Sequence, residues 1–265
     1  MDKQRLLDRC GVPEPERPAM RRVLDHLSRM VDRDTASATD FLTPAQQTQA
    51  GTILRTAGIA PEQYRFWGGY GGAERQTLLF FPAYLTPAQG ISQAPIRCLR
   101  AAFRREEGLC HRDFLGSLTA LGIVREKVGD ILVSPDSADV LVLDTVADFL
   151  LQNWQSAGRA ALRLREIDPG DVQVPQAVFL HRRDTVSSLR LDAVCAAAIQ
   201  VSRRRSAELI AAGRVQLQGQ VCTKPDRPVM PGAQFTIRGG GKFALEETGS
   251  PTKKGRIPIT IKSWQ

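Results

Sequence analysis

The chain has little histidine and cysteine, the residues that most often hold metals or act as nucleophiles. Its three histidines, His26, His111 and His181, are scattered along the chain, so they predict no metal site. Its five cysteines form no CxxC pair and are odd in number, which argues against a zinc site or a disulfide framework. Cys110 precedes His111, but sequence neighbours on a helix do not face each other, so we expect no nucleophile–base pair there.

Long apolar runs are absent too, because no stretch approaches the length of a membrane span. The N-terminal sequence MDKQRLLDRCGVPEPERP is too charged for a signal peptide. We therefore expect a cytoplasmic protein that does not insert into membranes. The chain has 265 residues, of which 42% are hydrophobic, and this is enough for two or three domains with buried cores.

Several short sequences resemble catalytic motifs but lack the other residues that those motifs require. His111-Arg112-Asp113 matches the start of a protein-kinase catalytic loop, but Leu118 stands where the asparagine is required. The glycines of GGYGGAER and of GGGK fit neither a dinucleotide-binding fingerprint nor a phosphate-binding loop. The sequence therefore predicts no catalytic residue, no cofactor and no metal.

Positive charge is concentrated in the C-terminal third. Residues 181–265 contain 15 basic and 6 acidic side chains, whereas residues 1–180 contain 21 and 22, within a total net charge of +8. Such an asymmetry indicates a nucleic-acid-binding module joined to a roughly neutral body. The alternative is a solvated basic face that has no partner.

Hydrophobic periodicity predicts helices and short strands mixed along the chain. Helices are expected over these ranges: 16–34, 43–58, 111–122, 145–157, 189–198 and 202–212. Strands are expected in RFWGGY, TLLFFP, ILVS and DVLVL, and over 95–103, 162–167, 215–217 and 235–237. This mixture favours α+β domains over a doubly wound sheet.

The most unusual segment is a helix start crowded with arginine. Arg203, Arg204 and Arg205 follow Ser202 in the first helical turn, where the helix dipole disfavours cations. Such a start suits a bound anion, because backbone N–H groups, hydroxyls and guanidinium groups then converge on phosphate. We predict a nucleic-acid-binding surface made of Arg190, Ser202, Arg203, Arg204, Arg205, Ser206, Arg214, Lys224, Arg238 and Lys242.

The same C-terminal segment, over about 185–245, resembles the S4-type RNA-binding domain. The residues that carry this resemblance are Arg190-Leu191-Asp192, Ser202-Arg203, Ile210, Gly213, Val215 and Gly219. The resemblance implies that Arg190, Ser202 and Arg203 lie on the surface that faces RNA. Gln218 stands where this kind of domain usually has asparagine before the glycine of a turn.

Two upstream strings extend the resemblance to nearly the whole chain. GGYGGAER at 68–75, and HRDFLGSL at 111–118 continued by GIVREKVGDI at 122–131, look like the YlmH family of S4-domain RNA-binding proteins. The family implies binding to rRNA and tRNA on the large ribosomal subunit, in the handling of stalled nascent chains. Protein partners from quality control or division machinery, and a monomeric state, are further expectations.

The resemblance completes the expected domain organisation, which is multidomain α+β with a two-part N-terminal region and a small S4-type domain. We expect an N-terminal α+β region over 1–80, a second α+β RNA-binding domain over 81–167, a linker over 168–181, the S4-type domain over 182–245 and a basic tail over 246–265.

The upstream strings allow two interpretations. Tyr70 and Arg75 suit base stacking and phosphate contact, and Arg112, Arg125 and Lys127 stand in the neighbouring strings, so a second RNA contact is predicted at these five residues. Alternatively, the glycines of GGYGGAER only serve turns and REKVGD is only a charged loop.

Three functions remain open from the sequence. The first is a non-enzymatic RNA-binding factor that acts on the ribosome. The second is an RNA-modifying enzyme, since S4-type domains are often attached to such enzymes, although we find no catalytic motif or cofactor loop upstream. The third is a factor in bacterial cell division or photosystem biogenesis, with which some members of the family are associated.

Overall fold

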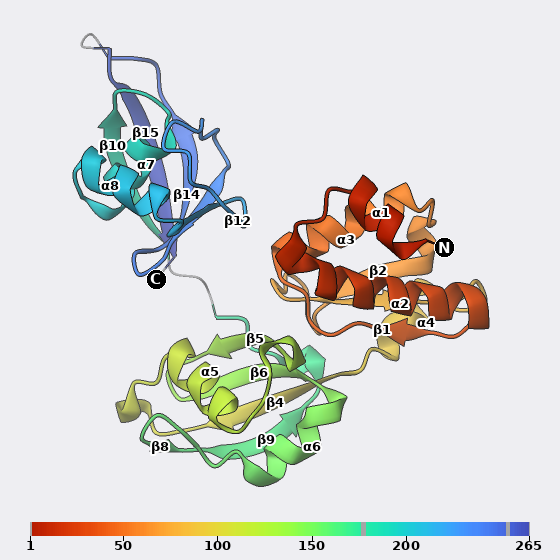
Figure 1. Cartoon of the computed structure of the whole chain (residues 1–265). Coiled ribbons are helices and arrows are strands. Elements are labelled where there is room, and N and C mark those ends of the chain that lie inside the picture. The colour runs from red at the N-terminus through yellow and green to blue at the C-terminus, as the bar shows by residue number, and fades with distance from the viewer. Residues whose placement is uncertain (1, 176–178, 253–254, 265) are drawn as a thin grey trace. The chain divides into compact units, whose positions relative to one another are not determined.

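A computed structural model describes residues 2–175, 179–252 and 255–264. The chain divides into two compact units, Met1–Pro175 and Gln176–Gln265 (Figure 1). Both units combine helices with antiparallel sheets, which confirms the predicted multidomain α+β class. None of the described helices is long and apolar enough to cross a membrane.

The first part of unit 1 packs helices against a small sheet. The helices are α1 (Lys3–Arg9), α2 (Arg17–Arg33), α3 (Pro44–Thr56) and α4 (Pro87–Ser92). The strands are β1 (Ser37–Ala38), β2 (Tyr64–Trp67) and β3 (Thr77–Phe80), in the order β1-β3-β2. The apolar face of α2 packs against α3 and β3, and this confirms the helices predicted at 16–34 and 43–58. The sequence patterns did not predict α1 or α4.

The second part of unit 1 is a four-stranded antiparallel sheet with the order β5-β6-β4-β9. Its elements are β4 (Ile96–Ala102), α5 (His111–Ala120), β5 (Val128–Val133), β6 (Ser137–Leu143), α6 (Asp144–Asn153) and β9 (Arg163–Ile167), with the small hairpin β7 (Ser156–Ala157) and β8 (Ala160–Ala161). This βαββαβ order is that of ferredoxin-like folds. Helices α5 and α6 bury Phe114, Leu118 and Leu150 on one face of the sheet.

Helix α6 ends four residues before the predicted end at Ala157. The backbone turns at Trp154, with φ −88° and ψ 89°, and the side chain enters the core, where it is 1% exposed. Its indole Nε1–H donates a 2.9 Å hydrogen bond to the Ser117 hydroxyl. Burial of this large ring therefore ends the helix, an effect that helical periodicity does not reveal.

The other face of this sheet is covered by the first part of unit 1. Phe41, Trp67 and Tyr70 pack against a cluster made of Ile96, Cys98, Leu141, Leu143 and Ile167. The approach is so close that a Cβ added at Gly129 would lie 2.7 Å from the Phe41 ring. Glycine is therefore required at this position for the two parts to meet.

Unit 2 is a six-stranded antiparallel sheet with two helices on one face (Figure 1). The strands are β10 (Phe179–Val186), β11 (Val215–Leu217), β12 (Gln220–Val221), β13 (Gln234–Ile237), β14 (Gly241–Thr248) and β15 (Ile257–Trp264), in the order β10-β15-β14-β13-β11-β12. The helices α7 (Leu191–Ile199) and α8 (Arg203–Ala211) confirm those predicted at 189–198 and 202–212. Gln218 and Gly219 join β11 to β12 with φ of 52° and 77°, as a two-residue hairpin turn requires.

The ends of unit 2 and the first boundary of unit 1 differ from the expected domain limits. The segment expected as a basic tail supplies β15, which pairs with β10 and β14 because Ile259 and Ile261 are buried in the core. Strand β10 begins inside the expected linker 168–181. Helix α4 packs on β2 and β3, so the first part of unit 1 extends beyond residue 80.

Candidate nucleic-acid interface

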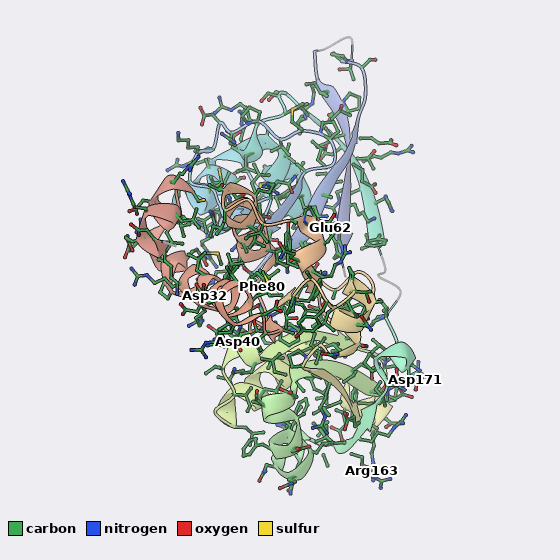
Figure 2. The ribbon with its side chains drawn as sticks, turned by 90° about the vertical axis from the view of Figure 1, so that its right-hand side faces the viewer. Asp32, Asp40, Glu62, Phe80, Arg163 and Asp171 are labelled. Atoms are coloured by element: carbon green, nitrogen blue, oxygen red, sulfur yellow. The ribbon has the colours of Figure 1, made fainter. Side chains whose placement is uncertain are left out.

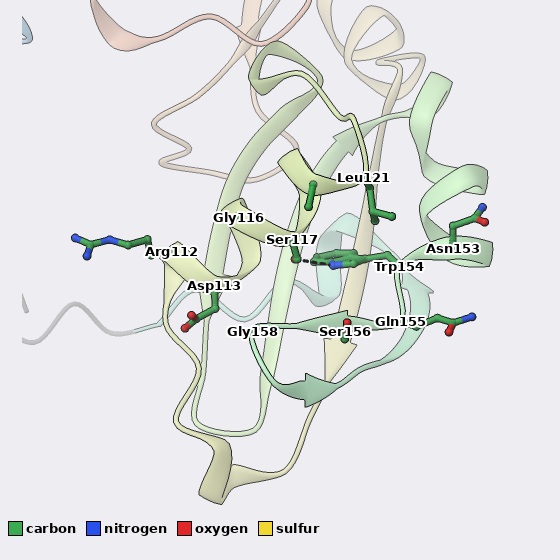
Figure 3. Close-up of a pocket in the computed structure, with 11 residues that line it drawn as sticks. Arg112, Asp113, Gly116, Ser117, Leu121, Asn153, Trp154, Gln155, Ser156 and Gly158 are labelled. Carbon is green, nitrogen blue, oxygen red and sulfur yellow. Dashed lines mark hydrogen bonds between the residues drawn. The ribbon is translucent and has the colours of Figure 1, made fainter.

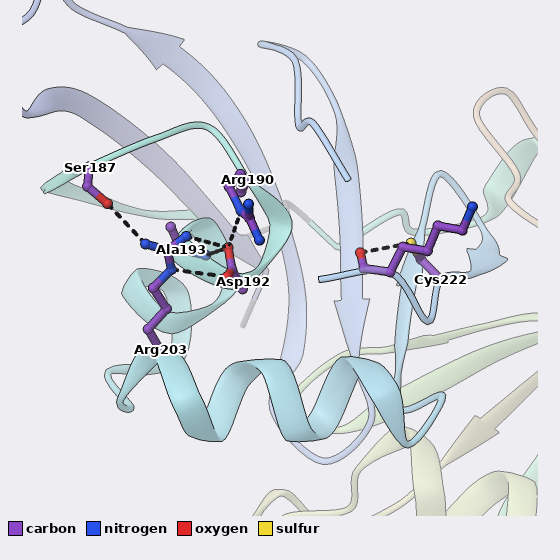
Figure 4. Close-up of polar contacts among 7 residues, drawn as sticks. Ser187, Arg190, Asp192, Ala193, Arg203 and Cys222 are labelled. Atoms are coloured by element: carbon purple, nitrogen blue, oxygen red, sulfur yellow. Dashed lines mark hydrogen bonds and ion pairs between the residues drawn. The ribbon is translucent and has the colours of Figure 1, made fainter. Parts of the chain in front are cut away.

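The Asp192 carboxylate holds the arginines at the starts of α7 and α8 in place. The carboxylate, with 9% of the side chain exposed, accepts from Nε and Nη2 of Arg203 at 3.0 and 3.2 Å. It also accepts from Nε of Arg190 at 3.4 Å and from the backbone N–H of Ala193 at 2.9 Å. Figure 4 shows Arg203 lying between Asp192 and Ser187, whose hydroxyl accepts from Nη1 at 3.3 Å. Two guanidinium groups are thus held in place by one nearly buried carboxylate.

Helix α8 begins as the sequence predicts. Ser202 is its N-cap, and the hydroxyl accepts from the backbone N–H of Arg205 at 3.1 Å. The Arg204 side chain is 92% exposed and lies 3.4 Å from Glu208, while Nη1 of Arg205 lies 3.1 Å from the same carboxylate. Together with Arg190 and Arg203, these arginines give four guanidinium groups against two carboxylates, so the helix start keeps a net positive charge.

A groove of about 400 Å³ lies beside Arg203, between α7 and β10. Ala193, Ala196 and Ala197 line it with small side chains, and Arg256 lies on another part of its wall. Nε of Arg256 donates to the Thr185 hydroxyl at 2.8 Å, which fixes its position. Arg256 lies in the segment that the sequence predicted as a basic tail, so its position beside Arg203 was not predicted.

The other predicted cations of unit 2 lie away from the start of α8. Arg214 and Arg238 are exposed neighbours, joined by a 2.8 Å hydrogen bond from the Arg238 N–H to the Arg214 carbonyl. They follow the far end of α8, a helix whose length is about 14 Å. Lys224 is exposed in the loop after β12, and Lys242 alternates with the core residue Phe243, so it faces the side of the sheet without helices.

Ser206 was predicted as an RNA contact, and its burial corrects that prediction. The residue is 0% exposed, because it faces inward on the first full turn of α8. Its hydroxyl finds no hydrogen-bond partner among the described residues. A group with no accessible surface cannot touch RNA, so Ser206 leaves the predicted set, whose remaining members at the start of α7 and α8 are Arg190, Ser202, Arg203, Arg204 and Arg205.

The strings GGYGGAER and REKVGD meet each other in unit 1. The Tyr70 hydroxyl donates to Oδ2 of Asp130 at 2.8 Å, and the backbone N–H groups of Glu74 and Arg75 donate to the same carboxylate at 2.7 and 3.0 Å. Burial and the adjacent Asp130 raise the pKa of Tyr70 well above its ordinary value. This arrangement, which we call the Asp130 latch, joins the two parts of the unit.

The arginines and the lysine near the latch also donate to protein acceptors. Arg75 donates to the carbonyls of Val128, Phe41 and Arg125 at 2.9, 3.3 and 3.1 Å. Burial, followed by the charge of Arg125, lowers the pKa of Arg75 to about 10, which still leaves it protonated at neutral pH.

Arg125 and Lys127 complete this set of contacts. Arg125 donates to the carbonyls of Val128 and Gly129, and Lys127 pairs with Asp40 at 2.7 Å. Figure 2 shows Asp40 near the border between the two parts of unit 1. These contacts favour the structural interpretation of the upstream strings over direct RNA contact.

Arg112, the remaining predicted contact, lines a separate cavity of about 640 Å³. Figure 3 shows its side chain pointing away from the Trp154 ring, which forms the inner wall beside α5. Because Trp154 is 1% exposed, it offers no face for base stacking. The cavity therefore presents one arginine and no accessible ring.

Comparisons with known proteins match all three regions of the chain. Family models described as "YlmH, N-terminal", "Putative RNA-binding domain in YlmH" and "S4 domain" match residues 15–85, 104–171 and 189–235. The Bacillus subtilis (strain 168) protein named "Ribosome-associated protein quality control protein P2" is 35% identical over 224 residues, which cover 84% of this chain and 86% of that protein.

A solved structure is similar in fold. The structure titled "Cell division protein ylmH from Streptococcus pneumoniae" is 20% identical, has a TM-score of 0.50, and covers 58% of this chain and 92% of that chain.

The sheet with α7 and α8 and the match over 189–235 define a protein that carries a C-terminal S4 RNA-binding domain. The two upstream matches and the Bacillus subtilis relative then make the assignment specific. The chain belongs to the YlmH family, which confirms the resemblance found in the sequence.

Proposed function

We propose that this protein is a non-enzymatic RNA-binding factor that docks on rRNA and tRNA of the large ribosomal subunit, in quality control of stalled nascent chains. The observation that carries the proposal is the arginine cluster ordered by Asp192 within a matched S4 domain. The name of the Bacillus subtilis relative, a ribosome-associated quality control protein, supports the same role. Work on ribosomes would place the protein in the cytoplasm.

The mechanism is docking of a preformed cationic surface. Asp192 holds Arg190 and Arg203 before RNA arrives, so less side-chain freedom is lost on binding. Arg204 and Arg205, exposed on the first turn of α8, reach phosphates directly. Structured RNA is recognised mainly by shape and by phosphate and ribose contacts, which such a rigid surface matches.

Binding without catalysis is also consistent with the buried cysteines. Burial raises the pKa of the Cys98 and Cys195 thiols to about 12, so both are protonated at neutral pH and poor nucleophiles. The part of the chain that the structure describes contains no cluster of three or more metal-ligating side chains.

The test is co-sedimentation of the full chain with large subunits, with small subunits and with random double-stranded RNA at physiological salt. We expect preference for large subunits, and weaker binding by the Arg204→Ala/Arg205→Ala variant. Arg33→Ala is the matched control, because Arg33 is exposed at the end of α2, outside the residues 104–171 that match the RNA-binding model, and should not change binding. Equal binding to all three particles would reject the ribosomal role.

The role in stalled nascent chains needs its own experiment. Large subunits that retain peptidyl-tRNA should bind the protein more tightly than empty large subunits. Equal binding to both would leave an rRNA-binding protein with no preference for stalled complexes, and the tRNA contact would be rejected.

A further inference from the structure

The sheet of unit 2 has a second face, which α7 and α8 do not cover. Core residues such as Phe243, Leu245, Ile259 and Ile261 point toward α7 and α8. Because side chains alternate along a strand, their neighbours point to the opposite side. We call this opposite side the outer sheet face; its residues include Phe179, His181, Lys242, Glu246, Lys262 and Trp264.

Two aromatic rings lie side by side on the outer sheet face. Phe179 of β10 is paired in register with Trp264 of β15, and their rings meet edge to face with centroids 5.7 Å apart. Phe179 is 37% exposed and Trp264 is half-buried. The two rings therefore form one contiguous apolar area that keeps accessible surface, and contiguous exposed apolar patches can mark binding sites.

Lysines are placed against both rings. Nζ of Lys262 lies 3.5 Å from the centroid of Phe179, and Nζ of Lys242 lies 5.1 Å from the centroid of Trp264. Two acidic residues stand near them. Glu246 contacts Nδ1 of His181 at 2.7 Å and lies 3.8 Å from Nζ of Lys262, and Glu247 is paired in register with Thr260 on the same face. The surface therefore combines aromatic rings with two lysine ammonium groups.

We propose that the outer sheet face binds single-stranded RNA, with an unpaired base stacked on Trp264 beside the Phe179 ring and phosphates near Lys242 and Lys262. Single strands are bound by this combination of aromatic rings and cations, and sheet surfaces that carry aromatic side chains stack unpaired bases. A duplex keeps its bases paired and stacked, so it cannot use the rings.

This surface is separate from the arginine cluster at the start of α8. Strands β10 and β15 both lie outside the residues matched to the S4 domain, 189–235, so the rings are an addition to that domain. The two surfaces lie on opposite sides of one sheet, because α7 and α8 cover the other face. The protein would then hold folded RNA on one side and an unpaired segment on the other.

The experiment uses the full chain and two labelled RNAs, a 12-nucleotide single strand without self-complementarity and a blunt duplex. Trp264→Ala should weaken binding of the single strand about 5- to 150-fold, since stacking of one base accounts for that range. Duplex binding should stay unchanged. Trp264→Phe keeps a ring and should retain most of the affinity, while Thr260→Ala, on the same face of β15, is the matched control without a ring.

Tryptophan fluorescence gives a direct readout of stacking. Saturating single-stranded RNA should quench the emission of the wild-type chain, and this quenching should be lost in Trp264→Phe, which leaves Trp67 and Trp154 in place. The Arg204→Ala/Arg205→Ala variant should weaken duplex binding and leave the quenching at saturation intact, which separates the two surfaces.

Three results would overturn the proposal. The first is single-strand binding that is unchanged in Trp264→Ala, together with quenching that is unchanged in Trp264→Phe. The second is an equal loss of single-strand and duplex binding in Trp264→Ala, which would give the ring a structural role only. If Trp264→Ala instead reduced only co-sedimentation with large subunits, the outer sheet face would bind protein, and the RNA proposal would be wrong.

Discussion

Tyr70 and Asp130, sixty positions apart in the sequence, share a 2.8 Å hydrogen bond that joins the two parts of unit 1. Each residue belongs to one of the two upstream strings that resemble the YlmH family. The strings GGYGGAER and REKVGD are therefore neighbours in the fold, and their side chains and backbone bind each other. This relationship explains their composition: one strand contributes a carboxylate, and a glycine-rich turn wraps its backbone N–H groups around it.

Removing the latch carboxylate should destabilise unit 1. Asp130→Ala deletes the acceptor of three hydrogen bonds. The backbone N–H groups of Glu74 and Arg75 and the Tyr70 hydroxyl then lose their acceptor. Hydrogen bonds to a charged group are worth more than neutral ones, so we expect a loss of about 3 kcal/mol in the free energy of unfolding. Urea denaturation measures it.

Asp136→Ala is the matched control for this variant. Asp136 is an exposed aspartate of the same sheet domain, and its replacement should change stability by no more than about 0.5 kcal/mol. Equal stability of the two variants would show that the Asp130 latch does not hold the parts of unit 1 together.

The arginines of α8 should differ in role: we expect Arg203 to stabilise the fold, and Arg204 and Arg205 to bind RNA. Arg203→Ala removes the main partner of Asp192, a nearly buried carboxylate, and should cost about 1–3 kcal/mol of stability. Arg204→Ala/Arg205→Ala should leave stability unchanged or slightly raised, since cations at a helix start oppose its dipole.

RNA binding distinguishes the two classes further. The Arg204→Ala/Arg205→Ala variant should reduce the slope of log affinity against log salt by about 1 for each lost phosphate contact. Titrations at several salt concentrations measure this slope. If affinity and slope were those of the wild type, the start of α8 would not be the phosphate-binding surface.

Ser206→Ala should be neutral or stabilising. The Ser206 hydroxyl is fully buried and finds no acceptor or donor among the described residues, so the native state carries a desolvation penalty that alanine removes. We expect the free energy of unfolding to rise by up to about 1 kcal/mol with RNA affinity unchanged. A loss of affinity without a loss of stability would return Ser206 to the binding surface.

The sequence predicted the helices and strands whose hydrophobic periodicity matches the side that the structure buries. The helix over 202–212 was predicted from its hydrophobic periodicity, and α8 confirms it. Strand β4 and helices α2, α3 and α5 were predicted for the same kind of reason.

Long-range contacts account for what the sequence did not reveal. The predicted RNA contacts Arg75 and Arg125 donate to carbonyls of distant segments, which no local pattern shows. Ser206 stands in a run of charged residues, yet the helical rotation turns it inward. Basic charge near the C-terminus suggested a tail, whereas the alternating isoleucines of β15 complete the sheet.

His26 should make the stability of unit 1 depend on pH. Burial, and then the charge of Arg29, lowers the pKa of His26 below 6.5, so below pH 6.5 the unfolded chain binds protons more readily than the folded one. Stability is therefore lost as pH falls from about 7 through 6.5 toward the lowered folded pKa.

Urea denaturation of His26→Gln between pH 7 and 5 checks this expectation. The variant should lose less stability over that range than the wild type. His111, whose pKa burial also lowers, should keep part of the pH dependence. A pH dependence identical to that of the wild type would show that His26 does not contribute.

Unit 2 should fold and bind RNA by itself if its N-terminal strand is kept. The fragment 176–265 contains β10 and the whole six-stranded sheet, whereas the fragment 187–265 lacks β10 and the core residue Val186. Without β10, eight residues of β15 lose their partners in the sheet and become an edge. We expect cooperative thermal unfolding of the longer fragment and a clear loss of stability in the shorter one.

RNA affinity of the longer fragment tests how the units cooperate. It carries most of the excess positive charge, so it should bind RNA with a strong salt dependence. On large subunits it should bind more weakly than the full chain, because a second contact in the same molecule raises the effective concentration of the first. Titration of both proteins with large subunits at one salt concentration measures the difference. Equal affinity would show that residues 1–175 do not take part in docking, and their matched RNA-binding domain would need another ligand.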